Sequence, residues 1–154
     1  MFNLIKYFII ILSSGFLSAQ SFSGGSGTES DPYQISTKED LLVLSNLPSN
    51  NPIIWNTGSY FIQTADIVFN SDETQVDWNG DGTVNSSDSE GFHPIGHHAN
   101  SLGHFQGEYD GGGHTIDNLY INRPNSEAVG MFGHIGNSPV IKNLSLTNVY
   151  VMGK

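Results

Sequence analysis

The feature that most constrains this chain is an internal repeat in its C-terminal third. The segment Ile116-Asp-Asn-Leu-Tyr-Ile121 returns 25 residues later as Ile141-Lys-Asn-Leu-Ser-Leu146. Self-similarity at such a period is typical of solenoids, in which one repeat is one supersecondary unit. The spacing of the apolar residues predicts a short, half-buried strand in each copy. We also expect the repeated Asn side chains to stack and to hydrogen-bond to one another along the solenoid axis.

A longer pattern around the repeat resembles a known family. It reads Gly107-x-x-Asp110-Gly-Gly-Gly-His114-Thr-Ile-x-Asn-Leu, then Gly130-Met-Phe-Gly133, then Ile141-x-Asn-Leu-x-Leu. This pattern resembles the GLUG-type repeat of secreted and surface proteins of bacteria, some adhesin-like and some related to immunoglobulin A peptidases. Met131 replaces the Leu that names the motif, a swap of similar volume that a core tolerates. The resemblance covers about a third of the chain and implies a right-handed parallel β-helix.

The N-terminus predicts export. Lys6 precedes an apolar run from Phe8 to Leu12, and small residues follow up to Ala19. This order describes a secretory signal peptide over residues 1–19. The alternative, a membrane anchor, is disfavoured because the apolar run is too short to span a bilayer. We therefore expect a secreted or cell-surface protein with no membrane span after cleavage.

Charge and composition exclude several classes of protein. Without residues 1–19, four basic residues face fifteen acidic ones, so the net charge is 4 − 15 = −11. Such a surface repels phosphate backbones, and we expect no nucleic-acid partner. The chain has no Cys, so disulfides cannot contribute to its stability. The expected partner is an extracellular ligand, protein or glycan, that the sequence does not identify.

The segments before the repeat predict a start and a cap for the strands. Residues 20–36 form a Ser/Gly-rich leader and a first strand, in which Tyr33 and Ile35 alternate with polar residues. Residues 37–47 predict a short amphipathic helix, with Thr37 and Asp40 placed to cap its N-terminus. Such a helix suits the end of a solenoid, where strand edges need cover. The rungs would then occupy residues 52–154, with strands over 52–55, 59–63 and 64–69.

The sharpest chemical motif is a loop over residues 77–88, inserted among the rungs. Oxygen-bearing residues occupy positions 1, 3, 5, 7, 9 and 12, and Gly82 occupies position 6, as in an EF-hand loop. The loop resembles that of dockerin modules, although no second loop is present and cohesin binding is therefore not expected. An alternative is a polar turn that binds no ion. We predict a structural calcium site with these ligands: Asp77, Asn79, Asp81, Thr83, Asn85 and Asp88.

Two classes of function remain open. The first is a non-catalytic module for adhesion or ligand presentation. The second is the N-terminal part of a carbohydrate-active β-helix enzyme, a lyase or glycoside hydrolase, or of a secreted peptidase. Glu108 and Asp110 are the nearest carboxylate pair, and we expect them on opposite faces of a strand. No serine, zinc or cysteine peptidase motif is present. With two clear rungs and no polar C-terminal cap, we expect the N-terminal portion of a longer protein.

Overall fold

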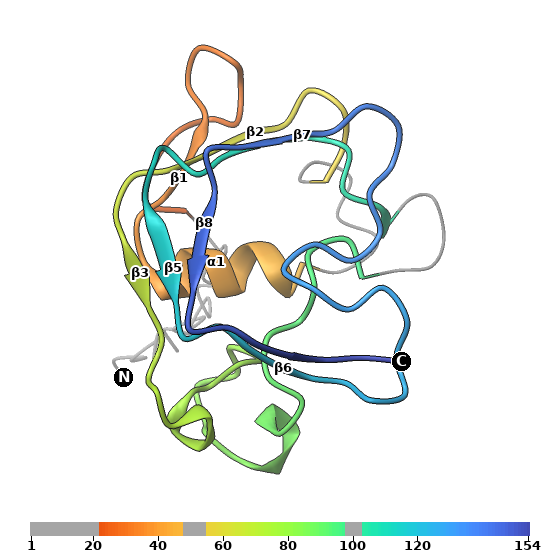
Figure 1. Ribbon diagram of the computed structural model, residues 1–154. Helices are drawn as coiled ribbons and strands as arrows, with labels where there is room; N and C mark the ends of the chain where they lie inside the picture. Colours follow the sequence, from red (N-terminus) through yellow and green to blue (C-terminus); the bar gives the residue numbers. More distant parts are fainter. Residues whose placement is uncertain (1–21, 48–54, 98–102) are drawn as a thin grey trace, which may run out of the picture.

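The part of the chain that the structure describes is built mainly of short β-strands with one α-helix (Figure 1). The computed structural model describes residues 22–47, 55–97 and 103–154. In these ranges no helix is long and apolar enough to cross a membrane. The elements are β1 (Tyr33–Ile35), α1 (Lys38–Ser45), β2 (Tyr60–Gln63), β3 (Ile67–Val68), β4 (Glu108–Asp110), β5 (Thr115–Asp117), β6 (Tyr120–Asn122), β7 (Val140–Lys142), β8 (Ser145–Thr147) and β9 (Tyr150–Met152).

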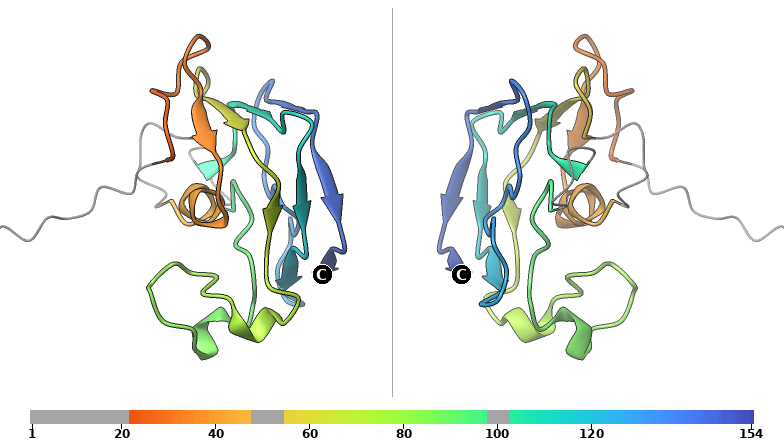
Figure 2. Two further views of the ribbon diagram at one scale, coloured as in Figure 1. Left: turned by 90° about the vertical axis from the view of Figure 1, so that its left-hand side faces the viewer. Right: turned by 90° about the vertical axis from the view of Figure 1, so that its right-hand side faces the viewer.

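Among the described residues, these strands form three sheets in which every pair of neighbouring strands is parallel. The orders are β1-β2-β4-β7, β3-β5-β8 and β6-β9. The chain passes through β4, β5 and β6, one in each sheet, and then through β7, β8 and β9 in the same sequence. Figures 1 and 2 show each strand of the second set beside its counterpart. The expected mainly β class is confirmed.

The strand register corrects the alignment of the repeat. Ile116 pairs with Leu146, thirty residues on, whereas Ile141 pairs with Tyr109. The six residues from Ile116 to Ile121 therefore correspond in space to those from Leu146 to Val151. The second copy, Ile141 to Leu146, instead spans the corner between β7 and β8. The 25-residue alignment was wrong because the pattern describes any strand–corner–strand unit, and one turn of the chain contains more than one.

The corner Asn residues do not stack on one another as expected. Asn118, Asn143 and Asn148 have φ angles of 59°, 52° and 49°, a left-handed conformation that Asn tolerates better than most residues. Each side-chain amide donates to the preceding turn of the chain. Asn143 Nδ2 donates to Asp110 at 2.9 Å, Asn148 Nδ2 to Asp117 at 2.7 Å, and Asn118 Nδ2 to the Phe69 carbonyl at 3.2 Å. Each corner Asn is therefore hydrogen-bonded to an Asp side chain or a backbone carbonyl of the preceding turn, and not to another Asn.

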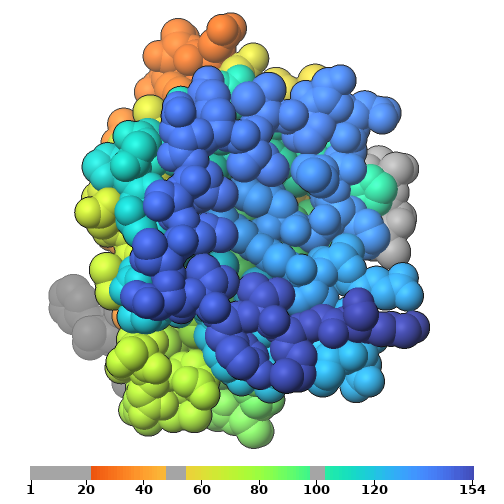
Figure 3. Space-filling view, in the orientation of Figure 1, coloured from red at the N-terminus to blue at the C-terminus, as the bar shows by residue number. Residues whose placement is uncertain are grey.

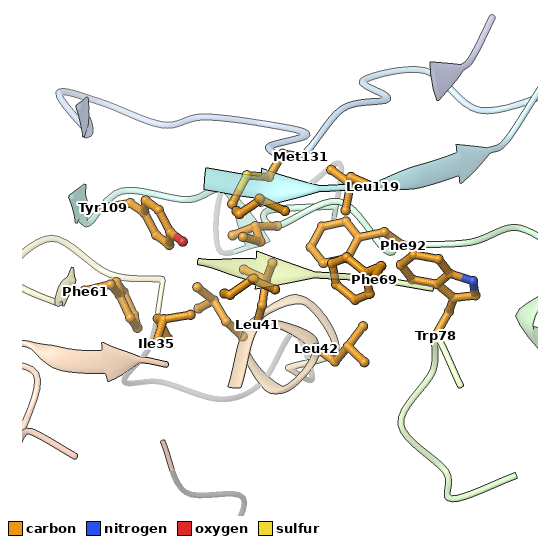
Figure 4. Close-up of a cluster of buried hydrophobic side chains, with 14 of the residues drawn as sticks. Ile35, Leu41, Leu42, Phe61, Phe69, Trp78, Phe92, Tyr109, Leu119 and Met131 are labelled. Carbon is orange, nitrogen blue, oxygen red and sulfur yellow. The ribbon is translucent and has the colours of Figure 1, made fainter. Parts of the chain in front are cut away.

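The apolar core lies between the sheets and the helix. Apolar strand residues from different sheets, such as Ile35, Tyr109 and Ile116, are fully buried. Figure 4 shows Leu41 and Leu42 of α1 within the same cluster. Thr37 and Asp40 form the predicted capping box at the start of α1, which lies within the range expected for the helix.

Some predicted segments lie outside the described residues. These are the signal peptide over residues 1–19, the first two residues of the leader and most of the strand expected over 52–55. The other expected strands are present, shortened to β1, β2 and β3.

Candidate functional site

The predicted calcium loop projects from the sheets between β3 and β4, in the lower part of Figure 1. Trp78 anchors it: its ring packs on Phe69, with centroids 4.7 Å apart, and is almost fully buried. The indole Nε1 donates to the Glu73 carbonyl at 3.0 Å, and the Trp78 carbonyl accepts from Asn46 Nδ2 at 3.0 Å. The second residue of the loop is therefore part of the core, and the polar residues that follow turn outward.

Asp77 organises the first half of the loop. Its Oδ1 accepts from the backbone N–H groups of Gly80 at 2.8 Å and Asp81 at 3.1 Å, and its Oδ2 accepts from Gly82 at 2.7 Å. Gly80 and Gly82 have φ angles of 71° and 88°, which glycine adopts without steric cost. The backbone of residues 77–82 therefore curves around the Asp77 carboxylate.

Asp88 joins the two halves of the loop. Its Oδ1 accepts from the Asn79 backbone N–H at 3.1 Å and its Oδ2 from that of Asn85 at 2.9 Å. Asn85 in turn caps the short 3₁₀ helix η2 (Ser86–Asp88). Asp88 is only 4% exposed. A buried carboxylate that accepts two backbone hydrogen bonds fixes the loop's ends relative to each other.

The remaining predicted ligands lie close by. Asp81 Oδ2 accepts from Asn79 Nδ2 at 3.1 Å, and the Thr83 carbonyl accepts from Asn85 Nδ2 at 2.9 Å. The six residues therefore form one hydrogen-bonded loop. In the described part of the chain, no three His, Cys, Asp or Glu side chains form a metal-binding group. The donors are all oxygens, the chemistry that calcium prefers, and calcium also takes amide and carbonyl oxygens. The donor set therefore fits calcium.

The carboxylate pair considered for catalysis lies elsewhere and is arranged differently from our expectation. Glu108 and Asp110 share the outward face of β4, because residues two apart in a strand point the same way. Both contact Lys142 on β7: its Nζ bonds to the Glu108 carboxylate and lies 3.6 Å from Asp110 Oδ2. The Glu108 hydrogen bond raises the pKa of Lys142, and the Asn143 hydrogen bond lowers the pKa of Asp110. This cation partly neutralises the pair.

Other Asp residues tie successive turns together on the outer surface. Asp66 Oδ1 accepts from the Thr115 backbone N–H at 2.9 Å, which lowers the pKa of Asp66. Asp117 Oδ1 accepts from Thr147 Oγ1 at 2.6 Å and Asn148 Nδ2 at 2.7 Å, which lowers the pKa of Asp117. The backbone partner of Asp66 lies 49 residues along the chain. These carboxylates serve the stacking of strands.

A cleft that the sequence did not predict lies beside the loop. It has a volume of about 500 Å³ and runs between the insertion, from Glu73 to Ser89, and strand β6. Tyr120 and Asn122 form the β6 wall. Figure 3 shows the face of the molecule that the last strand (dark blue) crosses, with the insertion (yellow-green) at its lower left. Because the two walls lie more than thirty residues apart in sequence, no local motif could have indicated the cleft.

Two relatives share sequence similarity with most of this chain. It is 34% identical over 129 residues to a protein named Halomucin from Haloquadratum walsbyi, covering 84% of this chain and 1% of that protein. It is 31% identical over 144 residues to a protein from Evansella cellulosilytica named as a Gly-rich membrane protein, covering 94% of this chain and 14% of that protein. The chain thus spans a small part of either relative. No family model and no solved structure matches it.

Proposed function

We propose that this chain is an exported, non-catalytic module of a bacterial surface or secreted protein, used for adhesion or ligand presentation. Its architecture would be a GLUG-type, right-handed parallel β-helix. The observation that carries this proposal is the register, in which three strands recur thirty or so residues later in the same three sheets. A stack of this kind extends along one axis and presents its corners and insertions to solvent.

The relatives support a location at or outside the cell surface. One is named Halomucin and the other is named as a Gly-rich membrane protein. The signal-peptide pattern over residues 1–19 supports export independently. The salt bridges of Lys142 support a non-catalytic role for β4, because a carboxylate pair bound to a cation is poorly placed to exchange protons.

We further propose that the loop over residues 77–88 binds one structural calcium ion. Asp77, Asp81 and Asp88 bring three negative charges into one short loop, and a divalent cation would relieve their repulsion. The anchoring of Trp78 in the core couples the loop to the sheets. Ion binding would therefore stabilise the fold as well as the loop.

Calcium titration of the protein without residues 1–19 tests the proposal. Calorimetry should show one site, and a hundredfold excess of calcium over the dissociation constant should stabilise the fold by about 2.7 kcal/mol. The double variant Asp77→Ala/Asp81→Ala should lose both effects. Glu127→Gln, which changes an exposed carboxylate outside the loop, should lose neither. If the parent protein binds no calcium, the loop is only a polar turn.

A further inference from the structure

The cleft between the insertion and β6 has the size of a ligand site. Its volume of about 500 Å³ falls within the range of roughly 300–1,000 Å³ found for small-molecule sites. Both walls are held in place by the core. Tyr120 stacks on Tyr150, with ring centroids 5.1 Å apart, and its other near neighbour is the anchored Trp78, at 6.4 Å. The cleft therefore has fixed sides.

The polar groups that line the cleft are available to a ligand. Within the described residues, no hydrogen bond engages the side chains of five lining residues: Glu73, Ser86, Ser89, Tyr120 and Asn122. Together they offer a carboxylate, three hydroxyls and an amide, so both donors and acceptors are present. Val84, which is 46% exposed, adds an apolar surface. This mixture suits a ligand with many hydroxyls on an otherwise apolar ring.

Charge narrows the class of ligand further. The lining includes Glu73 and Asp88 and, among the described residues, no Lys, Arg or His. Phosphates, sulfates and uronates would be repelled. Asp88 is occupied by backbone donors, which leaves Glu73 as the one carboxylate of the lining without such a bond. A single carboxylate beside an amide and hydroxyls matches the vicinal hydroxyl groups of a sugar.

We propose that this cleft binds a neutral oligosaccharide. The inference rests on the proposed extracellular, ligand-presenting function and names its ligand class. Asn85 and Asp88 belong both to the predicted calcium loop and to the cleft wall. An ordered loop is therefore needed to shape the site, and the experiment is performed with calcium present.

The probes are cellotriose, maltotriose and chitotriose, titrated by calorimetry into the full exported chain. At least one should bind saturably, and Glu73→Gln, Tyr120→Phe and Asn122→Ala should each weaken binding about tenfold, as the loss of one hydrogen bond predicts. Thermal melts confirm that each variant is folded. Glu127→Gln, which lies outside the cleft, is the control and should bind as the parent does.

Two results would overturn the inference. One is the absence of saturable binding by all three saccharides. The other is binding of tetralysine with the same sensitivity to Glu73→Gln and Asn122→Ala, which would make the cleft a site for basic peptides. Trigalacturonate, an acidic saccharide, should not bind. A calcium titration of the same sample separates the two proposals: calcium binding without saccharide binding would remove the cleft inference alone.

Discussion

Two successive turns of the chain carry the same residue pattern but differ in burial. In the turn of β4, β5 and β6, the central residues Tyr109, Ile116 and Ile121 are fully buried. Their partners in β7, β8 and β9 are Ile141, Leu146 and Val151, which are 36%, 38% and 47% exposed. In each pair both side chains are large and hold the same register position in their sheet. A central side chain of these strands is therefore buried only where another turn of the chain packs against it.

The opposite end of the stack shows what a covering layer achieves. There α1 lies against the first strands, and Leu41 and Leu44 are fully buried. Asp40 fixes the helix: its Oδ2 accepts from Ser23 Oγ at 2.7 Å and from the backbone N–H groups of Ser36 at 2.9 Å and Thr37 at 3.0 Å. The helix ends the stack at this side because its apolar face substitutes for a turn of strands.

The largest expected effect is a difference in the free energy of unfolding between variants of the two turns. Ile116→Ala should destabilise the protein by about 2–5 kcal/mol, because it leaves a cavity in a closed core. Leu146→Ala, its partner in the next turn, should cost about 1 kcal/mol, because that side chain is already partly in water. Urea unfolding of both variants measures the difference. Equal losses would show that the outer turn is covered in solution.

The next largest effect on stability is expected at the end of the stack that α1 covers. Asp40→Ala should cost about 1–3 kcal/mol, because it removes a buried carboxylate and leaves the partly buried N–H groups of Ser36 and Thr37 without their acceptor. Glu39→Ala, one residue away and exposed, should change the free energy of unfolding by less than about 0.5 kcal/mol. Thermal melts compare the two. If the two variants have the same melting temperature, the Asp40 hydrogen bonds contribute little to holding the helix on the stack.

The smallest effect is expected from the hydrogen bonds between the turns on the outer surface. The pKa of Asp117 is lowered from its ordinary value of 3.8 by Thr147 and Asn148. A carboxylate with a lowered pKa stabilises the fold above its ordinary pKa, and this contribution disappears as the pH falls through the lowered value. Melting temperatures between about pH 6 and pH 2 should fall less for Asp117→Asn than for the parent. Glu29→Gln, an exposed carboxylate elsewhere, serves as the comparison.

Features set by near neighbours in sequence could be predicted. The helix followed from Thr37, Asp40 and the Leu residues after them, since a capping box needs only four consecutive residues. The tight conformation of the Asp77 loop followed from its Asp, Asn and Gly spacing for the same reason. The identity of any ion in that loop stays a prediction.

Features set by the stacking of distant segments could not be predicted. The register was assigned at 25 rather than thirty residues because Ile-x-Asn-Leu fits more than one corner of a turn, and only pairing distinguishes the corners. The contact of Asp66 with Thr115 carries no local signal, because Thr115 approaches from the following turn. The cleft requires both the insertion and β6, so neither segment alone carries a signal for it.

The amides of Asn143 and Asn148 reach only to the turn directly before them. A segment of about thirty residues duplicated in frame at the outer turn would therefore find the same kind of partners in the turn before it. Each such event would change the length of the stack by one strand spacing, about 4.8 Å. Recombination between repeats would then vary how far such a protein reaches while the insertion and its neighbours are inherited intact.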